Sequence, residues 1–114
     1  MEERRAAQRV TDVRPVLEEI RRRLVSCFHP ERIILFGSHA TRRAGPDSDV
    51  DLLIVMPFVG RHFDQALAIR QLLRGVGAAK DIVVLRPQEF AAQRDVPGSI
   101  AYPAAHEGIS LDAA

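Results

Sequence analysis

The sequence predicts a small α/β or α+β domain, and three observations support this class. Segments with helical and strand-like patterns follow one another in the order helix, strand, strand, helix, strand, helix. The strand-like segments are nearly uninterrupted apolar runs, which is typical of a sheet covered on both faces. The chain has 114 residues, of which 46% are hydrophobic and 27% charged, as in one ordinary globular domain. We therefore expect a frayed terminus over residues 1–10 and a single domain over residues 11–114.

The first predicted element is an amphipathic helix over residues 11–28. Its apolar residues recur at helical spacing as far as Cys27, which we expect in the core. Thr11 or Asp12 can cap the helix, and Pro15 is tolerated because it falls in the first turn.

The remaining elements follow from apolar runs and from the residues that interrupt them. Three runs predict strands, at residues 32–36, 49–56 and 80–85. Two further segments predict helices, at residues 61–74 and 88–94. The tail from Ser99 fits no single state, and a helix broken around Pro103 is one interpretation.

The composition excludes several classes of protein. The single cysteine, Cys27, rules out an internal disulfide and a cysteine-based zinc site. The longest apolar stretch, residues 52–59, is far shorter than the roughly 20 residues of a membrane span, and no apolar signal segment follows the charged N-terminus. We therefore expect a soluble cytoplasmic protein with no membrane partner.

Charge is unevenly distributed along the chain. Residues 1–43 hold ten arginines against six acids, and residues 44–114 hold six basic residues against nine acids. One interpretation is compositional drift toward arginine. The other is a bipolar surface, with guanidinium groups that suit phosphate at one pole and acids that suit a metal ion at the other.

Two aspartates mark the start of the second predicted strand. Asp49 and Asp51 are two residues apart, so their side chains point to the face on which Leu53 and Val55 continue into the core. Paired carboxylates in a partly desolvated cleft are costly, and a divalent cation relieves that cost. Mg²⁺ takes oxygen ligands of this kind and leaves positions for a substrate phosphate. The alternative is a solvated aspartate-rich turn at a strand start.

A Gly-Ser pair at the end of the first predicted strand favours the metal interpretation. Gly37 lets the backbone approach a ligand closely. Backbone amides at this point can bind an anion, and the Ser38 hydroxyl can bond a phosphate oxygen. Asp81 opens the third strand and adds a carboxylate at the same end of the sheet, as a further metal ligand or as a general base.

Other metal and phosphate motifs fail on spacing. Asp47, Asp49 and Asp51 imitate the first ligands of an EF-hand, but Leu52 and Phe58 stand where that loop needs Gly and Glu. The sequence holds no P-loop string, and its Gly-x-Gly pair follows a predicted helix rather than a strand, which excludes a dinucleotide-binding fingerprint.

The spacing of these residues is similar to the signature of the nucleotidyltransferase superfamily that includes DNA polymerase beta. Gly37-Ser38 is followed, after ten residues, by Asp49-x-Asp51, and the surroundings resemble the minimal nucleotidyltransferases, or MNT domains. The resemblance implies a mixed sheet flanked by helices and two Mg²⁺ ions held by Asp49 and Asp51. It also implies Asp81 as the third carboxylate, and nucleotide phosphates bound by Gly37 and Ser38.

The resemblance further implies a reaction and a partner. The reaction is transfer of AMP from ATP to a hydroxyl, with release of pyrophosphate. Many minimal proteins of this kind are similar to antitoxins paired with HEPN-domain ribonuclease toxins, and some AMPylate a tyrosine of the toxin. Arg42 and Arg43, in the loop before the aspartates, are expected to contact the nucleotide phosphates. This chain has His39 where the family often has Arg, and Arg42 where it often has Gly.

Two other functions stay open at this point. The chain can be a non-catalytic nucleotide-binding subunit that neutralises a HEPN toxin by contact. It can also transfer a nucleotide to a small molecule, with a second subunit holding the acceptor. Direct binding of nucleic acid is not expected.

Overall fold

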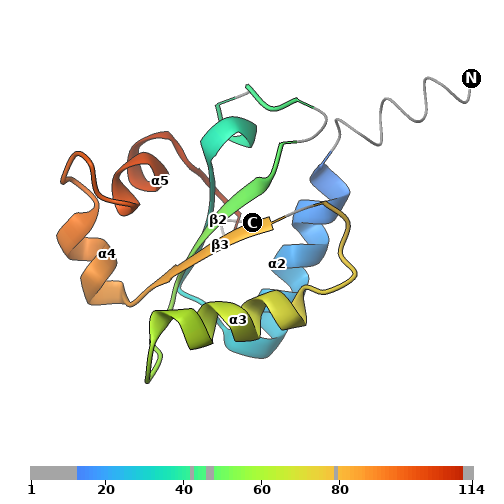
Figure 1. Cartoon of the computed structure of the whole chain (residues 1–114), viewed down its shortest axis with the longest axis horizontal. Coiled ribbons are helices and arrows are strands. Elements are labelled where there is room, and N and C mark those ends of the chain that lie inside the picture. Colours follow the sequence, from blue (N-terminus) through green and yellow to red (C-terminus); the bar gives the residue numbers. More distant parts are fainter. Residues whose placement is uncertain (1–12, 42, 46–47, 79, 112–114) are drawn as a thin grey trace, which may run out of the picture.

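The structure is a computed structural model that describes residues 13–41, 43–45, 48–78 and 80–111 (Figure 1). Its helices are α2 (Arg14–Phe28), α3 (His62–Leu72), α4 (Pro87–Gln93) and α5 (Ala101–Glu107), and η1 (Gly37–His39) is a short 3-10 helix. Its strands are β1 (Arg32–Phe36), β2 (Val50–Val55), β3 (Lys80–Leu85) and β4 (Ile109–Ser110). The predicted order of helices and strands is confirmed, and α5 and β4 follow it. The frayed terminus predicted for residues 1–10 lies outside the described residues.

The described strands form one mixed sheet in the order β3-β2-β1-β4. β1 runs antiparallel to both β2 and β4, whereas β2 runs parallel to β3. A parallel pair needs a crossover connection, and α3 lies in the connection between β2 and β3. The predicted α+β class, with a small mixed sheet flanked by helices, is thereby confirmed.

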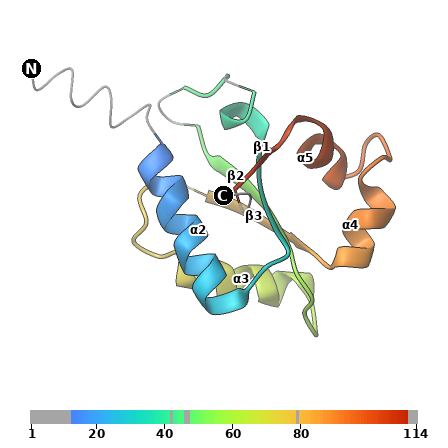
Figure 2. The same ribbon diagram turned by 180° about the vertical axis from the view of Figure 1, so that it is seen from behind.

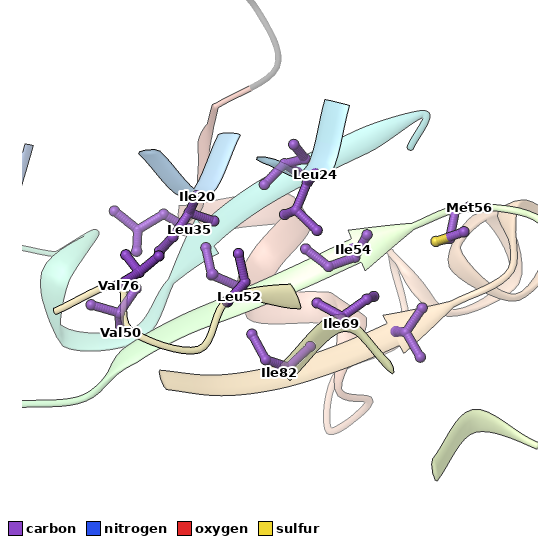
Figure 3. Packing of buried hydrophobic residues seen from close by; sticks show 13 residues of the cluster. Ile20, Leu24, Leu35, Val50, Leu52, Ile54, Met56, Ile69, Val76 and Ile82 are labelled. Carbon is purple, nitrogen blue, oxygen red and sulfur yellow. The ribbon is translucent and has the colours of Figure 1, made fainter. Parts of the chain in front are cut away.

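Helices cover both faces of the sheet, as the apolar strands predicted. The pair α2 and α3 packs on one face, and the pair α4 and α5 packs on the other (Figures 1 and 2). Alternate residues of β2 divide between the two layers. Leu52 and Ile54 cluster with Leu24 of α2 (Figure 3), whereas Leu53 clusters with Phe90 of α4. Complete burial of such a side chain contributes about 1.5–3 kcal/mol, so both layers stabilise the sheet.

The first helix ends at residue 28 as predicted, but its start and the burial of Cys27 differ from the prediction. It begins at residue 14, and its N-cap position makes no side-chain cap hydrogen bond. The predicted caps, Thr11 and Asp12, lie outside the described residues. At the other end the prediction of a buried Cys27 is wrong, because this side chain is exposed. Phe28, four residues after the buried Leu24, packs against the core in its place.

The C-terminal tail is more regular than its sequence indicated. Pro103 sits in the first turn of α5, where a missing N–H is tolerated, so the helix is not broken. Gly108 then brings the chain against β1, where a Cβ would collide with Ala104 O and with Ile34 Cγ2. Ser110 pairs with Ile34 and so adds β4 to the sheet. None of the helices in the described ranges has the length and apolarity to cross a membrane.

Candidate active site

Strand register brings the predicted site residues to one end of the sheet. In the antiparallel pair, Phe36 at the end of β1 lies opposite Asp51 near the start of β2. In the parallel pair, Asp51 lies beside Asp81 near the start of β3. The Gly-Ser turn that follows β1 therefore lies next to the amino ends of β2 and β3 (Figure 1). Segments up to 44 residues apart in the sequence, from Gly37 to Asp81, meet at this edge, as predicted.

Gly37 is required by the geometry of the turn. Its φ of +77° lies in the left-handed region, which disfavours residues with a side chain. A Cβ at this position would collide with Asp51 Oδ2 and lie 3.1 Å from Asp51 Cγ. The Gly37 carbonyl accepts hydrogen bonds from the backbone N–H of Ala40 and of Thr41, both at 3.1 Å. The turn thus holds the Asp51 carboxylate directly against the bare backbone of Gly37.

The loop after this turn is tied to it by main-chain contacts. The Arg43 N–H donates to Ser38 O at 2.8 Å, and a His39 ring nitrogen lies 3.2 Å from Ser48 O. The Ser38 side chain is half-buried and makes no hydrogen bond to another described residue, so its hydroxyl is available to a ligand. The Arg43 side chain is exposed. Arg42, the other predicted phosphate contact, lies outside the described residues.

The Asp51 carboxyl group sits in an unfavourable electrostatic position. Burial raises its pKa above the ordinary value, and the negative charges of Asp81 and Asp49 raise it further. The positive field of His39 acts in the opposite direction. Asp51 is thus near enough to Asp49 and Asp81 to be repelled by both, and it is the most buried of the three carboxylates.

The third carboxylate has a partner of its own. Asp81 Oδ1 lies 3.6 Å from Arg70 Nη2 of α3, and both side chains are largely exposed. Within the described ranges, no three His, Cys, Asp or Glu side chains converge closely enough to hold a metal ion. Asp81 therefore raises the pKa of Asp51, but the described residues around it do not form a ready-made metal site.

The donor set fits a divalent cation at Asp49 and Asp51. Both offer the carboxylate oxygens that hard cations prefer, and one or two such ligands are usual for Mg²⁺. A cation would also remove the repulsion that raises the pKa of Asp51. Asp81 is paired with Arg70, but an ion pair between exposed groups is worth only about 0–1 kcal/mol, so a cation can compete for this carboxylate.

Two residues of the site were not assigned by the sequence. His39 contacts the Ser48 carbonyl and lowers the pKa of Asp51. The sequence offered one indication of this role, namely that His39 directly follows the Gly-Ser pair. Arg70 gave no local signal, because its contact with Asp81 exists only after α3 has crossed over to β3.

Comparisons with known proteins agree with this geometry. Residues 16–100 match the family model of a nucleotidyltransferase domain, and this range includes the Gly-Ser turn and the three carboxylates. Among solved structures, the chain is similar to a candidate nucleotidyltransferase from Sulfolobus solfataricus, with a TM-score of 0.57 and 24% identity. That similarity covers 84% of this chain and 76% of the other chain, and it shows a shared fold. No curated protein matches the sequence.

Proposed function

The chain belongs to the nucleotidyltransferase domain family, and we propose that it transfers AMP from ATP to a hydroxyl of a partner protein. The observation that carries the proposal is the half-buried Asp51 carboxylate, held against Gly37 and repelled by two further carboxylates. Carboxylates that raise the pKa of a partly buried neighbour in this way suit a reaction that brings its own cations with a triphosphate. The acceptor would be a tyrosine of a HEPN-type toxin, with this chain as the antitoxin. This finer assignment is supported by the resemblance to minimal nucleotidyltransferases.

Asp49 and Asp51 would hold Mg²⁺, with Asp81 as the third ligand of a two-ion site. When bound, Mg²⁺ would neutralise phosphate charge and lower the pKa of the acceptor hydroxyl. The chain itself supplies the positioning. Gly37 lets phosphate oxygens approach the backbone, and the Ser38 hydroxyl donates a hydrogen bond to one of them.

Asp81 is the residue proposed to accept the proton of the attacking hydroxyl. It lies at the same sheet edge as Asp51 and is exposed, so an acceptor side chain can reach it. The oxygen of the acceptor would then bond to the α-phosphorus while the bond to pyrophosphate breaks. Release of Asp81 from Arg70 would come before this step.

The test is label transfer from α-labelled ATP in the presence of MgCl₂ to a purified HEPN-type toxin, the class of partner proposed for this chain. We expect the wild-type chain to label that protein and the Asp49→Asn/Asp51→Asn variant to lose at least 100-fold of the rate, about 2.7 kcal/mol at 1.36 kcal/mol per tenfold. Asp64→Asn is the matched control, because Asp64 of α3 is an exposed aspartate that pairs with Arg61. Equal labelling by the wild type and the double variant would exclude the proposed reaction.

A second candidate is a subunit that neutralises its partner by contact alone. The ion pair between Asp81 and Arg70 favours it, because this pair occupies the third carboxylate with a protein cation. The same double variant separates the two functions in cells that express the toxin. Continued suppression of toxicity by Asp49→Asn/Asp51→Asn supports neutralisation by contact, and loss of suppression supports catalysis.

A further inference from the structure

Two arginines lie over one buried phenyl ring, and one of them begins β1 at the end of the strand opposite to the Gly-Ser turn. Phe90 of α4 is only 4% exposed, and the guanidinium carbons of Arg32 and Arg94 lie 5.4 Å and 5.3 Å from its ring centroid. Arg32 begins β1, and Arg94 follows directly after α4. Both side chains are half-buried. Both arginines and Phe90 line a small pocket of about 70 Å³.

Among the described residues, no carboxylate forms an ion pair with either guanidinium group. Six other arginines of the described chain form ion pairs with carboxylates. Within the same described ranges, Arg32 and Arg94 contact the ring but pair with no Asp or Glu. The acid next in sequence, Asp95, instead lies 3.0 Å from a ring nitrogen of His106. Two like charges at one half-buried pocket repel each other, and an anion between them would remove that repulsion.

We propose that this pocket binds a phosphate dianion between Arg32 and Arg94. Two fixed positive charges match a dianion, and guanidinium forks match the geometry of phosphate oxygens. Ser110 of β4 also lines the pocket. The volume of about 70 Å³ suits one phosphate group and is far below the roughly 300–1,000 Å³ of a pocket for a whole nucleotide.

The pocket is separate from the candidate active site. Arg32 is the first residue of β1 and Phe36 is the last, so the strand places them about 14 Å apart at about 3.4 Å per residue. Gly37 follows at the far end. The phosphate therefore does not belong to the nucleotide proposed there, and the inference does not depend on the proposed reaction. The bound phosphate group is either a free phosphate ion or a phosphate monoester on a partner.

The test is an NMR titration of the full chain that follows the arginine Nε–H signals. Inorganic phosphate, O-phosphoserine and acetate are added separately, at constant ionic strength and without divalent ions. We expect saturable shifts of Arg32 and Arg94 with both phosphates, and at least tenfold weaker binding of acetate. Stronger binding of inorganic phosphate than of phosphoserine indicates the free ion as the source, and the reverse order indicates a monoester.

Variants show whether the arginines carry the binding. Arg94→Gln should weaken phosphate binding about tenfold or more, as expected for the loss of one charge-assisted contact. Arg61→Gln is the control, because Arg61 is exposed and already paired, and it should leave the affinity unchanged. Asp51→Asn should also leave it unchanged. The proposal is overturned if the Arg32 and Arg94 signals do not shift, if acetate binds as tightly as phosphate, or if Asp51→Asn abolishes binding. The wild-type shifts decide the question even if Arg94→Gln fails to fold.

Discussion

Replacement of Gly37 by alanine tests the close approach on which the candidate site depends. The new Cβ would collide with the Oδ2 atom of Asp51 and lie 3.1 Å from its Cγ. The backbone φ of +77° would also be strained by any side chain. Gly37→Ala therefore combines a backbone penalty with a steric penalty, and the two can be separated.

The magnitude follows from these two terms. A non-glycine residue in the left-handed region costs about 1–2 kcal/mol. Forcing an extra methyl group into occupied space costs about 1–3 kcal/mol more. Gly75 supplies the matched control, because its φ is +85° and a Cβ there would meet nothing within 4 Å. We expect Gly37→Ala to lower the free energy of unfolding by about 2–5 kcal/mol and Gly75→Ala by about 1–2 kcal/mol.

The assay is urea unfolding of each variant, alone and combined with Asp51→Ala. Removal of the Asp51 carboxyl group frees the space that the new Cβ needs, so the cost of Gly37→Ala should fall to that of Gly75→Ala. The coupling between the two substitutions should then be at least about 1 kcal/mol, as found for residues in direct contact. Equal costs at both glycines in the wild-type background, or no change in the Asp51→Ala background, would refute the reasoning.

Two further predictions concern carboxylates with shifted pKa values. Burial and the neighbouring carboxylates raise the pKa of Asp51, so its ionisation costs stability, and that cost is fully present above the raised pKa. Asp51→Asn should thus unfold at higher urea than the wild type at pH 7, and the gap should close as the pH falls through the raised pKa of Asp51 and be gone below about 4, where the unfolded carboxyl group is protonated as well. The N–H of Arg86 bonds Glu89 at 2.7 Å and lowers the pKa of Glu89, with His62 adding to the shift. Glu89→Ala should cost about 1 kcal/mol at pH 7, and the loss should shrink as the pH falls through the lowered pKa of Glu89.

The fold was predictable where sequence patterns are long and local. The three apolar strands and the helix over 62–72 each span several residues with one periodicity, and the structure has them within a few residues of the predicted bounds. β4 was not predictable, because two exposed residues carry no pattern and pair only through the approach at Gly108. Cys27 was misplaced because the helical stripe extends equally well to Phe28. Which of two neighbouring positions is buried depends on the partner surface, and the helix alone does not define that surface.

The sequence was sufficient to predict which strand ends meet at the site. Gly37 and Asp51 could be expected together, since they flank a loop between successive strands. Asp81 could be expected at the same edge, and the parallel register with Asp51 confirms that placement. Its contact with Arg70 depends on the crossover of α3, which no local pattern encodes. The catalytic and binding roles of these residues stay predictions that the variants above test.

Two locally unfavourable features, a left-handed backbone conformation and a partly buried carboxylate, lie in contact at the Gly-Ser turn. Gly37 occupies a backbone conformation that is costly for every other residue, and Asp51 places a carboxylate where burial and two like charges oppose its ionisation. Each feature alone has structural explanations, such as a tight turn or a strand that begins near solvent. Their direct contact is harder to explain by folding alone, because a neutral side chain at position 51 would remove the repulsion. A site that receives cations together with a phosphate explains both features, since the cations compensate the carboxylates and the bare backbone of Gly37 leaves room for the phosphate.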